Sequence, residues 1–157
     1  MSIVLLPHGE TSSPTDQLTT SSCLSVIKTT VIIPSCLSKT TGQRPTIAYA
    51  PDNASKRTAT LIASMFHTDI ISCDALGETI DENGLRELVF RLLGSSRDFI
   101  AVTHAETIDA LVSIVSELSG NSYTDRRTKP LSALQFVAIN TEAREINTIT
   151  APAKILA

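Results

Sequence analysis

The chain has 157 residues, of which 42% are hydrophobic and 18% are charged, so it can bury an apolar core of ordinary size. Its net charge of −3, its few aromatic residues and its lack of tryptophan argue against a protein that binds nucleic acid or an anionic membrane. We therefore expect one domain over residues 1–157, with neither a nucleic acid nor a membrane as its partner.

The cysteines and the start of the chain bear on its compartment. The three cysteines, Cys23, Cys36 and Cys73, are odd in number and lack CxxC spacing, which argues against a disulfide framework and a zinc ribbon. An apolar strand is predicted from residue 2 or 3, which leaves no room for a signal peptide, and no apolar run approaches the roughly 20 residues of a membrane span. We expect a cytoplasmic protein.

The first half of the chain alternates short apolar runs with stretches of helical spacing. The apolar runs end at proline, glycine or polar residues, as buried strands do. The second predicted helix has Asn53 as its N-cap. Strands are predicted over residues 2–6, 45–49 and 69–72, and helices over 19–31 and 53–66.

The second half continues the alternation. Leu85, Leu88, Val89 and Leu92 fall at positions i, i+3, i+4 and i+7, and Gly94 follows, which predicts an amphipathic helix with a glycine end. The last two apolar runs are predicted to be strands that pair with each other. Helices are predicted over residues 81–93 and 107–118, and strands over 99–102, 134–139 and 145–149.

This alternation predicts an α/β three-layer sandwich with a mostly parallel central sheet. In such sheets, ligands bind at the carboxyl ends of the strands. His8 follows the first predicted strand, and His104 follows the strand over 99–102. We therefore expect both imidazoles at the same edge of the sheet.

A pair of histidines at such an edge suggests phosphoryl transfer. A neutral imidazole attacks phosphorus to form a phosphohistidine that water can release. A carboxylic acid must protonate the leaving oxygen, and positive charge must hold the phosphoryl oxygens in the transition state.

The motifs resemble those of the histidine phosphatase superfamily, the phosphoglycerate-mutase-like proteins. Residues 7–11 read Pro-His-Gly-Glu-Thr where the family has Arg-His-Gly-Glu-Thr, and residues 16–19 read Asp-Gln-Leu-Thr where it has Asp-x-x-Leu-Thr. Residues 50–59 follow the family's Ser-Pro-x-x-Arg-Ala-x-x-Thr-Ala, residues 76–78 match Leu-x-Glu, and residues 102–108 follow Val-Thr-His-Gly-Gly-Thr-Ile. The resemblance covers nearly the whole chain, and its length is that of the short phosphohistidine phosphatases.

The resemblance implies a role for each matching residue. His8 is the candidate nucleophile, His104 the second histidine of the pocket and Glu78 the candidate proton donor, while Thr103 is a candidate phosphate ligand. The family's chemistry uses no cofactor or metal, so none is expected. A metal held by His8, His104 and Glu78 is the alternative, but their spacing gives it no local support. The plainer alternative is that His8 is a turn residue and His104 a helix cap.

The sequence departs from the family where positive charge is needed. The two phosphate-binding arginines fall on Pro7 and Ala54, and Glu106 replaces a glycine beside His104. Arg57 follows Ala54 by one helical turn and could bind phosphate instead. A basic loop before the strand at 134–139 could also fold over the site; its charged residues are Arg126, Arg127 and Lys129.

Three functions are therefore compatible with the sequence. The first is a degenerate member of the fold, a pseudoenzyme that is impaired or inactive and acts as a binding or structural subunit with a protein partner or assembly. The second is an active phosphatase that hydrolyses a phosphoprotein or a small phosphorylated ligand through phospho-His8. The third is a remodelled pocket that accepts a neutral or cationic molecule near Glu106.

Overall fold

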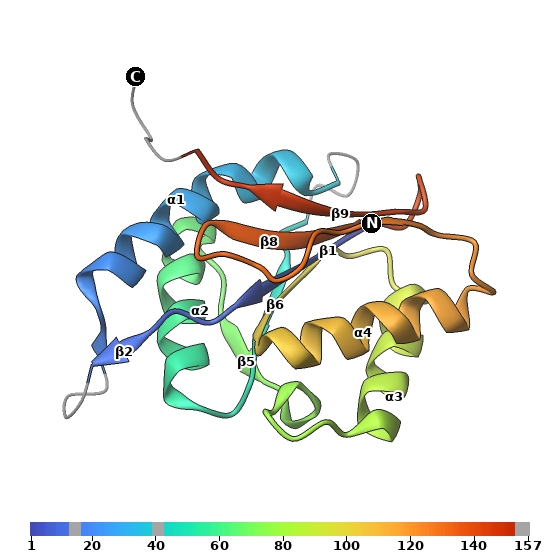
Figure 1. The fold of residues 1–157 in the computed structure, drawn as a ribbon, viewed down its shortest axis with the longest axis horizontal. Coiled ribbons are helices and arrows are strands. Elements are labelled where there is room, and N and C mark those ends of the chain that lie inside the picture. The colour runs from blue at the N-terminus through green and yellow to red at the C-terminus, as the bar shows by residue number, and fades with distance from the viewer. Residues whose placement is uncertain (13–16, 39–42, 153–157) are drawn as a thin grey trace.

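The apolar run at the start of the chain forms the central strand of a seven-stranded sheet (Figure 1). The computed structural model describes residues 1–12, 17–38 and 43–152. The strands of the sheet run in the order β5-β4-β6-β1-β8-β9-β7, and a two-stranded hairpin, β2-β3, stands apart from it. The strands are β1 (Ser2–Pro7), β2 (Thr11–Ser12), β3 (Gln17–Leu18), β4 (Thr46–Tyr49), β5 (Ile70–Ser72), β6 (Phe99–Thr103), β7 (Thr124–Arg126), β8 (Gln135–Asn140) and β9 (Glu145–Thr150).

The helices connect the parallel strands of the sheet. They are α1 (Thr20–Cys36), α2 (Asn53–Phe66), α3 (Glu82–Leu93) and α4 (Ala105–Leu118), with a short 3₁₀ turn, η1, at Asp74–Leu76. Strands β1, β6, β4 and β5 pair in parallel, whereas β8 pairs antiparallel with both β1 and β9. The prediction of an α/β sandwich with a mostly parallel sheet is therefore confirmed.

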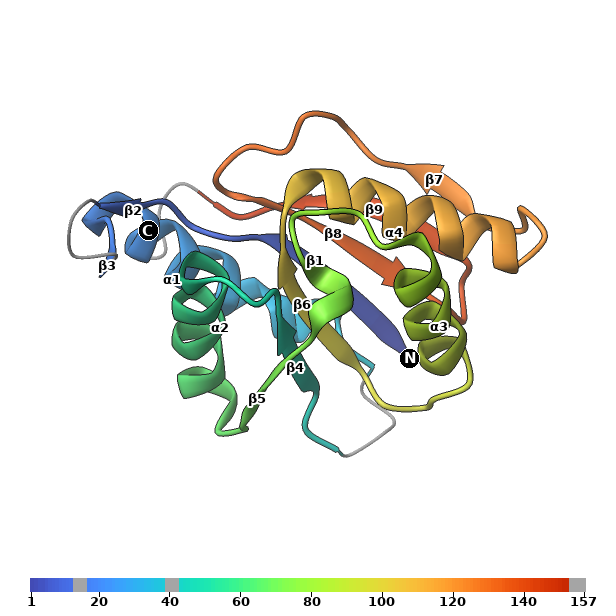
Figure 2. The ribbon, with the colours of Figure 1, turned by 90° about the horizontal axis from the view of Figure 1, so that it is seen from below.

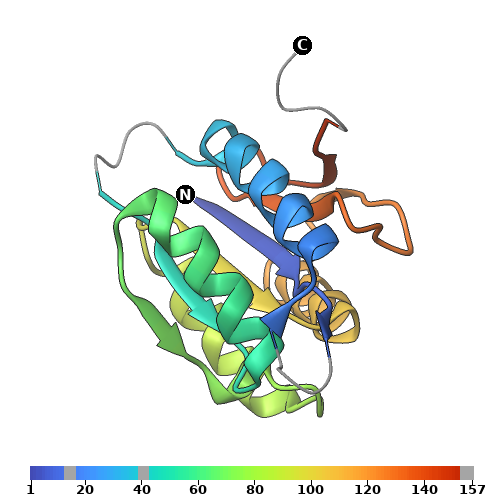
Figure 3. The same ribbon diagram turned by 90° about the vertical axis from the view of Figure 1, so that its left-hand side faces the viewer.

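Two pairs of helices cover the two faces of the sheet. Helices α1 and α2 lie on one face, and α3 and α4 lie on the other (Figures 2 and 3). Successive side chains of a strand point to opposite faces, so Val4 packs with the α1 and α2 side while Ile3 packs with the α3 and α4 side. Both are essentially buried, and each such side chain contributes about 1.5–3 kcal/mol of hydrophobic free energy.

The predicted elements are all present, with shifted ends. Helix α1 continues to Cys36, beyond the predicted end at residue 31, because Ile33 is buried against the sheet and holds the last turn in place. Its N-cap is Thr19, whose side chain accepts from the Ser22 N–H; Asp16, the first residue of the Asp-Gln-Leu-Thr match, lies outside the described residues. Strands β2, β3 and β7 are too short to show a periodic pattern and were not predicted.

The N-cap predicted for the second helix is wrong by one residue. Asp52, not Asn53, caps α2, and its carboxylate accepts from the Ser55 backbone N–H at 2.8 Å. His67 ends this helix in the left-handed conformation and is exposed, as expected for an isolated histidine after a helix. None of the helices in the described segments has both the length and the apolarity that crossing a membrane requires.

Candidate functional site

Three parallel strands end side by side at one edge of the sheet. His8 follows β1, His104 follows β6 and is the N-cap of α4, and Asp52 lies three residues after the end of β4. The backbone joins these ends, because the His8 N–H donates to the Thr103 carbonyl at 3.0 Å. We call His8, His104 and Asp52 together the histidine edge.

The structure brings His8 and His104 together, as the strand order predicts. Their ring centroids are 4.7 Å apart and the ring planes meet at 73°, an edge-to-face arrangement. His104 is more enclosed than a surface histidine, with 16% of its side chain exposed. The two imidazoles therefore form a contiguous surface at the carboxyl end of the sheet.

One hydrogen bond sets the orientation of the His8 ring. Nδ1 of His8 lies 2.9 Å from the Gly9 carbonyl oxygen. Because a carbonyl can only accept, Nδ1 carries the proton, and Nε2 of the neutral ring keeps its lone pair. This is the tautomer that a histidine nucleophile requires.

The turn after His8 is packed tightly against two helices. The Gly9 N–H donates to the Thr58 hydroxyl at 2.9 Å, and that hydroxyl donates to the Ala54 carbonyl of α2 at 2.8 Å. A Cβ at Gly9 would lie 3.1 Å from the side chains of both Leu18 and Ser22. Only glycine fits here without displacing its neighbours, which explains the glycine after the histidine.

His104 is held by a carboxylate. Its Nε2 lies 2.9 Å from Oδ2 of Asp52, and the same oxygen accepts from the Ser55 hydroxyl at 3.1 Å. Burial raises the pKa of Asp52, but the hydrogen bonds from Ser55 and the contact with His104 outweigh this and lower the pKa below its usual value. Asp52 is therefore a carboxylate at neutral pH, and its Oδ2 is placed to accept a hydrogen bond from Nε2–H of His104.

Asp52 was not singled out from the sequence, although a signal for it existed. Asp52 and Ser55 have the spacing of an N-cap that accepts from the third residue of a helix, directly after a buried strand. Since that strand is parallel to β6, its carboxyl end had to lie at the same edge as His104. The Asp52 carboxylate therefore both caps α2 and contacts His104.

A pocket of about 310 Å³ opens beside His8, between the end of β1, helix α1 and the segment that leads into β8. Five hydroxyl-bearing residues contribute to its lining. Of the described residues that line it, Glu10 is the one acidic residue. We call it the serine pocket; its hydroxyl-bearing residues are Ser21, Ser22, Ser25, Thr29 and Ser132. No lysine or arginine of the described residues lines it.

The structure does not bring Arg57 to His8. Its guanidinium Nη1 lies 3.4 Å from the Gln17 side-chain oxygen, on the hairpin side of α2. There it lines a cavity of about 470 Å³ between α2, β3 and α1, which we call the arginine cleft. Its lining residues are Gln17, Leu18, Cys23, Asn53, Lys56, Arg57, Thr60, Leu61 and Ser64.

Two cations of the basic loop, Arg127 and Lys129, form ion pairs away from the serine pocket. Arg127 pairs with Asp109 of α4 at 3.0 Å and with Asp125 at 2.9 Å, and its side chain is 8% exposed. Lys129 lies 3.5 Å from the same Asp109, and Arg126 is exposed on β7. Arg127 thus links α4 to β7 through two carboxylates, and none of the three cations lines the serine pocket.

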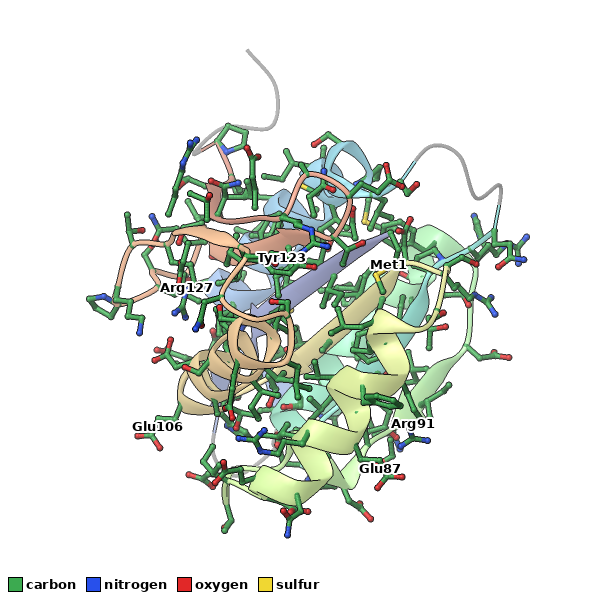
Figure 4. All side chains as sticks on the ribbon, turned by 90° about the vertical axis from the view of Figure 1, so that its right-hand side faces the viewer. Met1, Glu87, Arg91, Glu106, Tyr123 and Arg127 are labelled. Atoms are coloured by element: carbon green, nitrogen blue, oxygen red, sulfur yellow. The ribbon has the colours of Figure 1, made fainter. Side chains whose placement is uncertain are left out.

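The side chains of the remaining predicted residues, Thr103, Glu78 and Glu106, make no hydrogen bond or ion pair with the two histidines among the described residues. Thr103 is fully buried, and its hydroxyl donates to the Leu76 carbonyl at 2.5 Å. Glu78 is exposed and makes no hydrogen bond or ion pair with any described residue. Glu106 projects outward from the first turn of α4 and does not line the serine pocket (Figure 4).

The described residues contain no cluster of three histidine, cysteine, aspartate or glutamate side chains arranged as metal ligands are. Chemically, the histidine edge offers a nucleophilic nitrogen and a histidine–carboxylate pair. No lysine or arginine of the described residues lines the serine pocket beside His8, whereas Arg127 and Lys129 line a separate cavity of about 380 Å³ together with Ala105, the residue after His104.

Solved structures place this fold among known proteins. The protein histidine phosphatase SixA complexed with tungstate is similar with a TM-score of 0.68 and 13% identity, over 97% of each chain. A mycobacterial glucosyl-3-phosphoglycerate phosphatase complexed with VO3 has a TM-score of 0.65 and 12% identity, over 98% of this chain and 99% of that one. Phosphoglycerate mutase from Plasmodium falciparum has a TM-score of 0.56 and 13% identity, over 99% and 95%.

Sequence comparison adds no closer relative, since no family model and no curated protein matches the chain. At such low identities the structural likeness establishes the fold. The chain therefore has the histidine phosphatase, or phosphoglycerate-mutase-like, fold, and the resemblance read from the motifs is confirmed at that level.

Proposed function

We propose that the chain is a degenerate protein of the histidine phosphatase fold, impaired or inactive in phosphoryl transfer, that acts as a binding or assembly subunit for a protein partner. The observation that carries the proposal is the absence of arginine and lysine from the described lining of the serine pocket beside His8. The unpaired state of all three cysteines favours a reducing compartment, the cytoplasm.

Electrostatics supports impairment more strongly than any other property of the site. A transferred phosphoryl group spreads charge over three oxygens, and removing one arginine from such a site costs roughly 10³–10⁵ in rate. Here Pro7 and Ala54 stand at both arginine positions of the family pattern. The Asp52 carboxylate, bonded to His104, adds negative charge to the same edge.

Turnover tests the proposal. Hydrolysis of an aryl phosphate is measured with the wild-type protein and with His8→Ala, purified in parallel. We expect the two rates to be equal within error and near the uncatalysed rate. Turnover by the wild type that disappears in His8→Ala would overturn the proposal.

An active phosphatase is the second candidate, and one observation favours it. The Gly9 carbonyl fixes the His8 tautomer with Nε2 free, so the nucleophile is in its reactive form. On this alternative, His8 Nε2 attacks phosphorus, the leaving oxygen departs with a proton, and water then cleaves the phosphohistidine bond. The substrate would be a phosphoprotein or a small phosphomonoester.

Trapping distinguishes the second candidate directly. The protein is mixed with a labelled phosphoryl donor and quenched in alkali, in which a phosphohistidine survives. An acid-labile label on His8 that is missing from His8→Ala would establish this alternative. An unlabelled protein, over a range of phosphoprotein and small-molecule donors, would count against it.

A further inference from the structure

The arginine cleft contains two cations, Arg57 and Lys56, that have no counter-ion among the described residues. Arg57 and Lys56 are neighbours on α2, and neither forms an ion pair with any described residue. The hairpin β2–β3 lies against this part of α2 (Figure 2). Lys56 is exposed, but Arg57 is half-buried, and a half-buried guanidinium is unfavourable unless an anion or hydrogen-bond acceptors satisfy it.

The hydrogen bonding of Arg57 is incomplete. Its Nε is buried and has no acceptor among the described residues, and the hydrogen bond from its Nη1 to the Gln17 side chain is long at 3.4 Å. Buried donors are nearly always satisfied in folded proteins, so an orphaned guanidinium nitrogen beside a cavity calls for an explanation. A ligand oxygen in the cleft can supply the missing acceptor after a small rotation of the guanidinium.

The cleft has the size and the walls of a small-molecule site. Its volume of about 470 Å³ lies within the usual range for ligand pockets. Leu18 of β3 and Leu61, one turn after Arg57 on α2, add apolar side chains to the lining, and Thr60 and Ser64 add hydroxyls. The described lining includes no aspartate or glutamate that would repel an anion.

We propose that the arginine cleft binds a small organic oxyanion, a phosphate or carboxylate borne on an apolar group, through Arg57 and Lys56. The head group lies against the guanidinium and the ammonium, and the apolar group packs on Leu18 and Leu61. This site is separate from the serine pocket and does not depend on the function proposed above, because His8 lines one cavity and Arg57 the other.

Titration with two probes tests the site. Phenyl phosphate and benzoate are titrated in a zwitterionic buffer while the side-chain signals of Arg57 Nε–H and the Gln17 amide are followed by NMR, with benzylamine as the cationic control. We expect saturable shifts with at least one anion and none with benzylamine. The two anions separate a phosphate site from a carboxylate site, and saturation by neither overturns the proposal.

Variants locate the anion. Arg57→Gln removes the charge and keeps most of the side-chain length, so affinity should fall at least about tenfold, the usual consequence of losing one charge-assisted hydrogen bond. Lys56→Gln should weaken binding less. His8→Ala and the exposed, distant Arg91→Gln should leave affinity unchanged. Undiminished binding in Arg57→Gln, or loss of binding in His8→Ala, overturns the proposal.

Alkylation of the wild-type protein gives an answer that does not depend on how the variants fold. Cys23 lines the cleft, whereas Cys36 and Cys73 do not. We expect saturating phenyl phosphate or benzoate to slow alkylation of Cys23 by iodoacetamide and to leave the other two thiols unaffected. Equal rates with and without the anions would contradict occupation of the cleft.

Discussion

The histidine edge and the arginine cleft divide between them what a histidine phosphatase needs in one place. The edge has an oriented imidazole, His8, but no arginine or lysine of the described residues lines the serine pocket beside it. The cleft has Arg57 and Lys56 but no histidine. The position of His8 follows from strand order and one backbone carbonyl, and so persists with the fold. The charge depends on single side chains, and one substitution removes it.

The largest effect expected is a gain of anion affinity at the edge. Ala54 is half-buried on the first turn of α2, at the position where the family pattern has arginine. Ala54→Arg should strengthen orthovanadate binding at His8 by about tenfold to a hundredfold, the range for a charge-assisted hydrogen bond. Ala54→Gln, similar in reach but neutral, is the control, and calorimetric titration measures both. Equal affinities would show that charge is not what the edge lacks.

The tight turn after His8 gives the next largest effect. Gly9→Ala would place a methyl group 3.1 Å from Leu18 and Ser22, so we expect a loss of about 1–3 kcal/mol in the free energy of unfolding. Gly94→Ala is the matched control, because its Cβ would meet nothing closer than 3.7 Å. Urea denaturation compares them. A Gly9→Ala protein as stable as Gly94→Ala would mean that the turn is looser than the structure shows.

The histidine–carboxylate pair gives the smallest effect and has a distinct pH dependence. Asn caps helices as well as Asp, so Asp52→Asn removes the charge at His104 and keeps the cap of α2. The pKa of Asp52 is lowered in the folded state, so its stabilisation is complete above the unfolded value of about 3.8 and is lost as the pH falls through the folded pKa.

Asp52 is 36% exposed, so the expected difference in stability at neutral pH is below about 1 kcal/mol. Thermal melts of wild type and Asp52→Asn should therefore differ slightly at pH 6 and converge below pH 3. A stability difference that grows as the pH falls would contradict a stabilising contact between Asp52 and His104.

The sequence was sufficient to predict the fold and the proximity of His8 and His104. Both follow from long-range regularities: apolar runs that alternate with amphipathic helices, and residues that directly follow parallel strands. The same reasoning placed His8 and His104 at one edge, where their rings lie 4.7 Å apart.

Side-chain direction could not be predicted in the same way. Arg57 lies one turn after Ala54, yet its guanidinium meets Gln17 of β3, a strand of two residues with no periodic signal. Arg127 belongs to the loop that could have folded over the site, but it pairs with Asp109 and Asp125 instead. Asp52 was overlooked because its partner, His104, is distant in sequence. Each outcome depends on one contact between short or distant segments.

The most direct test of the central claim is an orthovanadate titration of the wild-type protein, followed through the imidazole NMR signals of His8 and His104. Orthovanadate resembles the phosphoryl group in its transition state, so it reports the charge stabilisation that the edge offers. We expect no saturable shift of either imidazole up to about 1 mM orthovanadate. A Kd of about 1 mM corresponds to a binding free energy of only about 4 kcal/mol. Saturation at micromolar vanadate, lost in His8→Ala, would show that the edge still holds a phosphoryl group and would contradict the claim.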